Sequence, residues 1–227
     1  MSISRVAPTN TASSSTVGRE IHKAPDPRTA ARGSIAGTVR DEAKAPIASA
    51  RVCITGWAKG LDDDELKDPI CLTTDAQGAF KADKLYAAHY SVTAGAKPYR
   101  PEAFHPGGNR HKTEFTLAPG EAKTQVDIVL RAGGAELTGT VSDISGGPIA
   151  HARVTASVGR WGEGASTPSV ETDDKGVYTL WTAPGMVRLS VIADGYASSR
   201  STTGRAPGTL DVLLTPCLLY TSPSPRD

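Results

Sequence analysis

Two tryptophans are the residues of this chain best suited to binding a ligand. Trp57 follows a short stretch of alternating apolar residues, and Trp161 follows a corresponding stretch, two positions later in register. An exposed indole can stack on the face of a sugar ring, whereas a mostly buried one only covers the edge of a core. Both interpretations remain open. In the first, Trp57 and Trp161, with Tyr99 and Tyr196, form a carbohydrate-binding surface.

Acidic residues and histidines suggest metal chemistry only weakly. The run LDDDE at 61–65 could bind calcium through its carboxylates, but it lacks the spaced ligands and the glycine of a known calcium loop. We therefore interpret it as a solvated loop. His105 and His111 flank a glycine-rich segment and could hold a metal ion weakly, yet no H-E-x-x-H pair is present. We predict no metal site and no cofactor.

Catalytic motifs are missing from the sequence as well. It contains no G-x-S-x-G elbow, no P-loop and no dinucleotide fingerprint, and Cys53 has no motif partner that would activate it as a nucleophile. We therefore predict that no residue is catalytic and that the chain is not an enzyme. The balance of 25 Lys plus Arg against 24 Asp plus Glu gives no electrostatic reason to expect a nucleic-acid partner.

The elements that must position these residues arise from an internal duplication. The segment GTVRDEAKAPIASARV at 37–52 matches GTVSDISGGPIAHARV at 139–154 in ten of sixteen positions, 102 residues apart. A second pair, TDAQGAF at 74–80 and TDDKGVY at 172–178, follows in the same order. Apolar residues alternate on both sides of these turns, which is typical of half-buried strands. The chain is therefore expected to hold two β-domains, with Phe80 and Tyr178 in their cores.

Composition sets the expected boundaries. Residues 1–32 are rich in Ser, Thr, Ala, Pro and Arg without apolar periodicity, which is typical of a disordered linker. The first repeat is expected at 33–132 and the second at 133–216. The last eleven residues, CLLYTSPSPRD at 217–227, match a translated sequencing-library adapter, and we interpret them as an artefact. No apolar run reaches the length of a membrane span, and the first residues lack a secretory h-region.

Each repeat resembles the carboxypeptidase regulatory-like domain. The resemblance rests on G-x-V-x-D-x-x-x-x-P-I-x-x-A-x-V in the repeated block, on T-D-x-x-G-x-F/Y at the hairpin, and on APGMVRLSVIADGY at 183–196. It implies two tandem seven-stranded Greek-key β-sandwiches of the prealbumin (transthyretin-like, Ig-like) type. Tandem copies are similar to those of bacterial envelope and surface proteins, which implies an extracytoplasmic location.

That implied location makes a disulfide between Cys53 and Cys71 the favoured interpretation, because disulfides persist in oxidising compartments. The alternative is a pair of buried thiols. The second repeat has Thr155 and about Ser169 at these places, so the bond is not part of the shared fold. The third cysteine, Cys217, falls in the adapter-like segment.

Three functions are compatible with the resemblance. The first is a non-enzymatic spacer or adhesion module in an envelope protein, with envelope proteins as partners and only Ala132, Gly133 and Gly134 between the repeats. The second is polysaccharide binding through Trp57 and Trp161, since the fold is also similar to starch-binding modules. The third is an accessory domain beside a peptidase encoded past Pro216. The motifs specify a fold and no activity.

Overall fold

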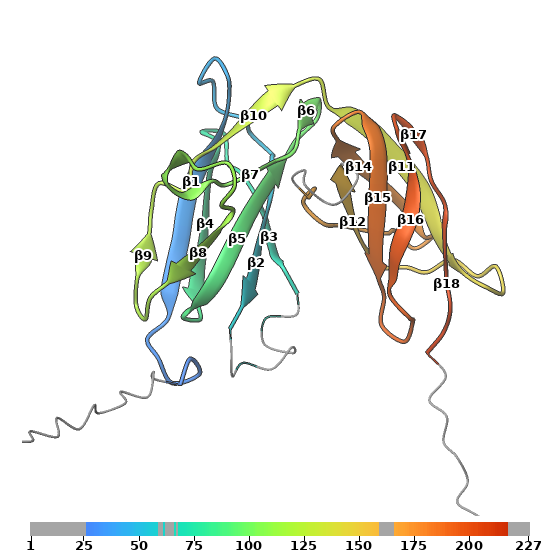
Figure 1. Ribbon diagram of the computed structural model, residues 1–227, viewed down its shortest axis with the longest axis horizontal. Helices are drawn as coiled ribbons and strands as arrows, with labels where there is room; N and C mark the ends of the chain where they lie inside the picture. The colour runs from blue at the N-terminus through green and yellow to red at the C-terminus, as the bar shows by residue number, and fades with distance from the viewer. Residues whose placement is uncertain (1–25, 59–60, 62–65, 67, 159–165, 218–227) are drawn as a thin grey trace, which may run out of the picture.

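The computed structural model describes residues 26–58, 61, 66, 68–158 and 166–217, which form two β-sandwiches in tandem (Figure 1). In the first repeat, one sheet has the order β4-β1-β10-β6 and β9 also pairs with β1; the other has the order β3-β2-β5-β7 and β8 also pairs with β5. The strands are β1 (Gly33–Asp41), β2 (Arg51–Trp57), β3 (Ile70–Thr73), β4 (Ala79–Leu85), β5 (Ala88–Gly95), β6 (Tyr99–Arg100), β7 (Glu102–Ala103), β8 (Glu114–Leu117), β9 (Ala122–Lys123) and β10 (Ile128–Ala132), with a 3-10 turn, η1, at Pro106–Gly108.

The second repeat repeats this plan with fewer strands among the described residues. One sheet has the order β14-β11-β17, with β18 also paired to β11, and the other has the order β13-β12-β15-β16. The strands are β11 (Ala135–Asp143), β12 (Arg153–Val158), β13 (Val170–Glu171), β14 (Val177–Thr182), β15 (Gly185–Ile192), β16 (Ser199–Ala206), β17 (Gly208–Thr209) and β18 (Val212–Leu214). The expected all-β fold of two tandem sandwiches is confirmed.

Strand alternation places one face of each sheet in a core. In β2, Val52 and Ile54 are buried in the first core, and Ala94 and Val92 of β5 lie opposite them on the neighbouring strand. The second repeat buries the equivalent positions in a core of its own. Phe80 and Tyr178 are 5% and 1% exposed, so both are core residues as their positions in the hairpin motif predict.

The threonine and the aspartate of the hairpin motif each form hydrogen bonds that hold this part of the fold together. The hydroxyl of Thr74 accepts from the Ala50 amide and donates to the Ile47 carbonyl, which ties the loop before β2 to the end of β3. The Asp75 carboxylate then accepts from the amides of Gln77 and Ala79, closing the turn. Thr172 and Asp173 form the same bonds in the second repeat.

The glycine of the repeated block is required by close packing. A Cβ on Gly37 would lie 2.0 Å from the Val126 carbonyl oxygen, and one on Gly139 would lie 2.0 Å from the Leu210 carbonyl oxygen. In both repeats, therefore, the first strand passes the segment before the last strand too closely for any side chain. The duplication has kept this constraint in both copies.

Two local expectations differ from the structure. Trp57, expected in a loop, is the last residue of β2, because the pairing of β2 with β5 continues to Trp57 opposite His89. Residues 26–32, expected in the disordered linker, include a turn in which Asp26 accepts bonds from Arg28 and Thr29. Arg32 then lies 3.3 Å from the centroid of the Tyr86 ring, on the first repeat.

The two sandwiches lie side by side in an inverted V (Figure 1). β10 runs into β11 at the top, and the two ends of the described chain lie at the opposite end of the molecule. The sheet containing β2 and β5 in the first repeat therefore faces the sheet containing β12 and β15 in the second. We call the surfaces that meet here the joint, and the pocket of about 1160 Å³ that residues of both facing sheets line the cleft.

Candidate functional site at the joint between the repeats

A disulfide lies on the first repeat's side of the joint. Cys53 of β2 and Cys71 of β3 are opposite one another in the sheet, and their sulfur atoms are bonded at 2.03 Å, which confirms the expected pairing. The sulfur atoms meet Ser169 of the second repeat: its hydroxyl oxygen lies 3.3 Å from Cys71 Sγ and 3.6 Å from Cys53 Sγ. The disulfide is therefore part of the contact between the repeats.

Equivalent arginines reach across the joint in both directions. Arg51 and Arg153 occupy the same position of the repeated block, at the start of β2 and of β12. The Arg51 side chain donates to the Ser169 carbonyl, and the Arg153 side chain donates to the Asp68 carboxylate. Each repeat thus sends one arginine to the segment before the third strand of the other. The joint resembles the self-complementary contact of a two-fold dimer, in which each partner contributes the same patch.

The connecting segment adds contacts at the top of the joint. The Gly134 amide donates to the Pro98 carbonyl, and a Cβ on Gly134 would lie 2.1 Å from the Tyr99 carbonyl oxygen. Lys97 Nζ of the first repeat lies 5.5 Å from the centroid of the Trp181 ring of the second. Backbone, cation-π and ion-pair contacts are therefore spread along the joint.

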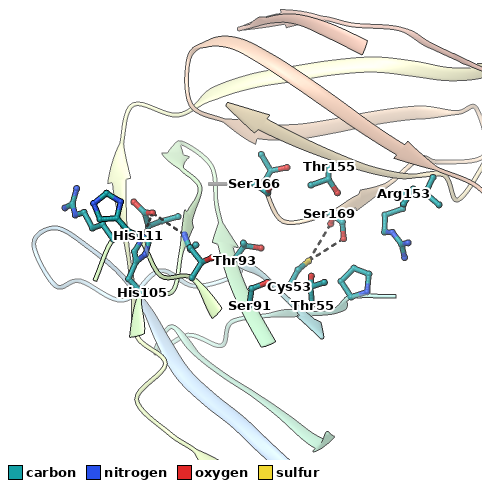
Figure 2. Close-up of a pocket in the computed structure, with 17 residues that line it drawn as sticks. Cys53, Thr55, Ser91, Thr93, His105, His111, Arg153, Thr155, Ser166 and Ser169 are labelled. Carbon is teal, nitrogen blue, oxygen red and sulfur yellow. Dashed lines mark hydrogen bonds and ion pairs between the residues drawn. The ribbon is translucent and has the colours of Figure 1, made fainter. Parts of the chain in front are cut away.

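Below the disulfide the facing sheets diverge and leave the cleft, with a volume of about 1160 Å³. Figure 2 shows the hydroxyls of Thr55, Ser91 and Thr93 on one side of it and those of Thr155 and Ser166 on the other. Charged and basic side chains from the segment around η1 also line it: Glu102, His105, Arg110 and His111. Most of the residues that line the cleft thus have polar side chains, many of them with hydroxyl groups.

Trp57 lies beyond the cleft, on the same outer face of β2 as Thr55. Its side chain is 51% exposed, and its ring stacks on the His89 imidazole with 4.2 Å between centroids and 19° between planes. His89 Nδ1 lies 3.1 Å from the Thr116 hydroxyl on β8. The indole is therefore held in place by its neighbours while half of it remains open to solvent.

Two of the other predicted ligand-binding residues, Tyr99 and Tyr196, pack against the cores of the two repeats. Tyr99, which follows the far end of β5, packs partly buried against the first core. Tyr196 packs in the same way against the second core. Trp161 lies outside the described residues, so nothing tests its role. Tyr99 and Trp57 lie at opposite ends of the paired strands β2 and β5, so these two aromatics do not lie next to one another.

The candidate metal ligands are placed as follows. His105 Nε2 is 3.2 Å from the Glu102 carboxylate and its Nδ1 is 3.3 Å from the Lys112 carbonyl, so internal partners occupy both ring nitrogens. His111 lines the cleft nearby. No group of three or more His, Cys, Asp or Glu side chains is placed to hold a metal ion in the part of the chain that the structure describes. The acidic residues 62–65 lie outside that part.

Sequence reasoning missed the residues that form the joint. From the sequence, Ser169 is only the counterpart of Cys71, and no pattern singles out Asp68. A signal did exist, since the arginine at 51 and 153 is one of the ten matches of the repeated block and its alternation places it outside the core. An arginine kept at the same outward position in both copies indicates a shared contact.

The fold and the joint define a class of protein: a pair of prealbumin-like β-sandwich modules in contact with one another. A sequence model of the carboxypeptidase regulatory-like domain matches residues 34–131 and 136–215, which together make up most of the chain. The chain belongs to the carboxypeptidase regulatory-like domain family. No curated protein sequence matches it.

Several solved structures are similar to this chain at low identity. The Bacillus anthracis TIE protein is 16% identical with a TM-score of 0.33, covering 82% of this chain and 34% of its own. A Streptococcal ancillary pilin is 10% identical with a TM-score of 0.33, covering 82% of this chain and 63% of its own. The shaft pilin SpaA from Lactobacillus rhamnosus GG is 14% identical with a TM-score of 0.32, covering 83% of this chain and 98% of its own.

The first of these structures is therefore of a much longer chain, of which this one spans about a third. In the described residues, no helix is long and apolar enough to cross a membrane.

Proposed function

We propose that this chain is a non-enzymatic structural module of an extracytoplasmic envelope or surface protein, in which two sandwiches are held at a set angle. The observation that carries the proposal is the joint. Ion-pair, disulfide, cation-π and backbone contacts along it restrict rotation more strongly than a two-glycine connection alone would. A module of this kind positions what precedes and follows it.

The side-by-side arrangement of the two repeats favours one kind of structural role over another. An array of domains joined end to end extends along one axis, and it separates the segments at its two ends by the sum of its domain lengths. Here the repeats fold back on one another, and both ends of the described chain leave from the same end of the molecule (Figure 1). The pair would reverse the direction of the chain, so that the segments before and after it lie at the same end of the module.

The test is small-angle X-ray scattering on the wild-type chain and on an Arg51→Ala/Arg153→Ala variant. We expect a single side-by-side arrangement to fit the wild-type profile, and the variant to show a larger radius of gyration because both reciprocal contacts are lost. Arg205→Ala, which removes an exposed arginine on β16, is the matched control and should scatter as the wild type does. A wild-type profile that only an ensemble of freely moving repeats can fit would reject the proposal.

A further inference from the structure

Some hydroxyl groups of the cleft, such as those of Thr167 and Ser169, have partners within the protein, and others have none among the described residues. In the described residues, the side-chain oxygens of Thr55, Ser91, Thr93 and Thr155 make no hydrogen bond, although all four line the cleft. A hydroxyl in a cleft that holds water exchanges readily between water and a polar ligand, at little net cost. Because the four hydroxyls come from both facing sheets, a ligand between the sheets could bond to both repeats.

The register of β2 and β5 arranges these groups in line with the exposed indole. Thr55 pairs with Ser91, Cys53 pairs with Thr93, and Trp57 pairs with His89. Side chains two residues apart on a strand share a face and lie about 6.6 Å apart. The outer face therefore carries a straight path from the Trp57–His89 stack, past the Thr55–Ser91 pair, to the hydroxyls at the disulfide end of the cleft.

Charged residues along the cleft supply stronger hydrogen-bonding groups. The Glu102 carboxylate is held by His105 at 3.2 Å, and the Arg153 guanidinium is held by Asp68. A carboxylate and a guanidinium that are fixed in this way can bond to neighbouring hydroxyls of a ligand without losing side-chain freedom on binding. With charges of both signs present, the cleft offers no strong electrostatic preference for a polyanion.

We propose that this face binds a polysaccharide strand, with one sugar ring stacked on Trp57 and the following rings in the cleft between the repeats. A sugar ring has an apolar face for an indole and a rim of hydroxyls for polar groups, which matches the indole and the hydroxyl row on this face. A peptide would require apolar side-chain pockets, and a nucleic acid would require a basic surface; neither matches this lining. The proposal extends the structural role, since both repeats contribute to the site.

Isothermal titration calorimetry of the full chain with the neutral oligosaccharides maltoheptaose, cellohexaose and chitohexaose tests the proposal. Hexagalacturonate is titrated in the same way as an acidic oligosaccharide. We expect at least one neutral oligosaccharide to bind with a Kd below about 1 mM. Trp57→Ala should weaken that binding about tenfold or more. Thr55→Val and Thr93→Val, which keep the side-chain shape and remove one hydroxyl, should each weaken it about three- to tenfold.

Two matched controls separate loss of the site from loss of the fold. Leu213→Ala truncates a side chain that is 67% exposed on β18, and Thr179→Val removes an exposed hydroxyl on β14. Both should bind as the wild type does, and all variants should keep the wild-type melting temperature. Absence of binding by the wild type to every probe overturns the proposal. Binding that Thr55→Val and Thr93→Val leave unchanged, or that the controls weaken equally, overturns it too.

Discussion

Two buried tyrosine hydroxyls have pKa values that folding shifts strongly. Tyr90 and Tyr178 are each 1% exposed, and their hydroxyls donate to the carbonyls of Tyr86 and Leu210. Burial raises the pKa of Tyr90 from 10.0 to about 12. Burial also raises the pKa of Tyr178 above its ordinary value, and the Asp211 carboxylate adds to this shift. Both hydroxyls therefore remain protonated in the folded state when they would ionise in an unfolded chain.

This shift predicts a loss of stability in alkali. Between pH 10 and about 12 an unfolded Tyr90 loses its proton while the folded residue retains it. Unfolding therefore releases a proton, and the free energy of unfolding falls as pH rises, by up to about 1.4 kcal/mol per pH unit for each such tyrosine. Urea melts of the wild type and Tyr90→Phe at pH 9, 10 and 11 measure the effect. The variant should show the shallower decline; equal slopes would contradict the assignment.

At the scale of the element, the hairpin motif is a hydrogen-bonding unit that both repeats share. Thr74 and Thr172 are 5% and 2% exposed, and each hydroxyl bridges the loop before the second strand to the end of the third. A buried amide and a buried carbonyl depend on each of these hydroxyls. The threonine of the T-D-x-x-G pattern is thus a link between strands, and the aspartate closes the turn.

Thr172→Val keeps the shape of this side chain and removes its hydroxyl. We expect a loss of about 1 to 3 kcal/mol in the free energy of unfolding, because the Ala152 amide and the Ile149 carbonyl lose their partner in a buried place. Denaturant melts followed by circular dichroism measure the loss. Thr179→Val, on the exposed face of β14, should stay within about 0.5 kcal/mol of the wild type. Equal losses of stability in the two variants would mean that the hydrogen bonds of the Thr172 hydroxyl contribute nothing to the free energy of unfolding.

At the scale of the whole molecule, the disulfide has two roles. It closes a loop with a sequence separation of 18 within the first repeat, and it presents the sulfur surface that contacts Ser169 of the second. Closing such a loop restricts the unfolded chain and stabilises the fold by about 3 kcal/mol in the chain-entropy description. The bond also couples the stability of one repeat to the contact between the two.

Removal of the bond should therefore have two effects. In a Cys217→Ser background, Cys53→Ala/Cys71→Ala should lower the free energy of unfolding of the first repeat by about 3 kcal/mol and leave the second repeat close to its original stability. The same variant should scatter X-rays as a more open particle than its parent, since Ser169 loses its contact. Denaturant melts that resolve the two repeats, together with scattering, check both effects. An unchanged particle shape would show that the remaining contacts hold the joint without the disulfide.

Much of this molecule could be predicted from local patterns in the sequence. The alternation of Val52 and Ile54 with Arg51 and Cys53, and the repeated turn at Asp75, follow from interactions between residues close in the chain. The duplication showed these patterns twice, which is why the two-sandwich fold and the core positions of Phe80 and Tyr178 could be anticipated. The same alternation predicted that Trp57 lies in the loop after the second strand, whereas it is the last residue of β2. Only the pairing of Trp57 with His89 shows where this strand ends.

The sequence by itself determined two prealbumin-like sandwiches, because each one depends on strand periods and turns that are encoded locally and kept in both copies. Only the tertiary structure decided how the two meet. Arg51 reaches Ser169, Arg153 reaches Asp68, and a hydroxyl-lined cleft opens between the repeats. These contacts join residues about 85 to 118 positions apart, on surfaces that differ between the copies. No periodicity encodes them, so the angle between the sandwiches and the cleft it leaves depend on long-range packing alone.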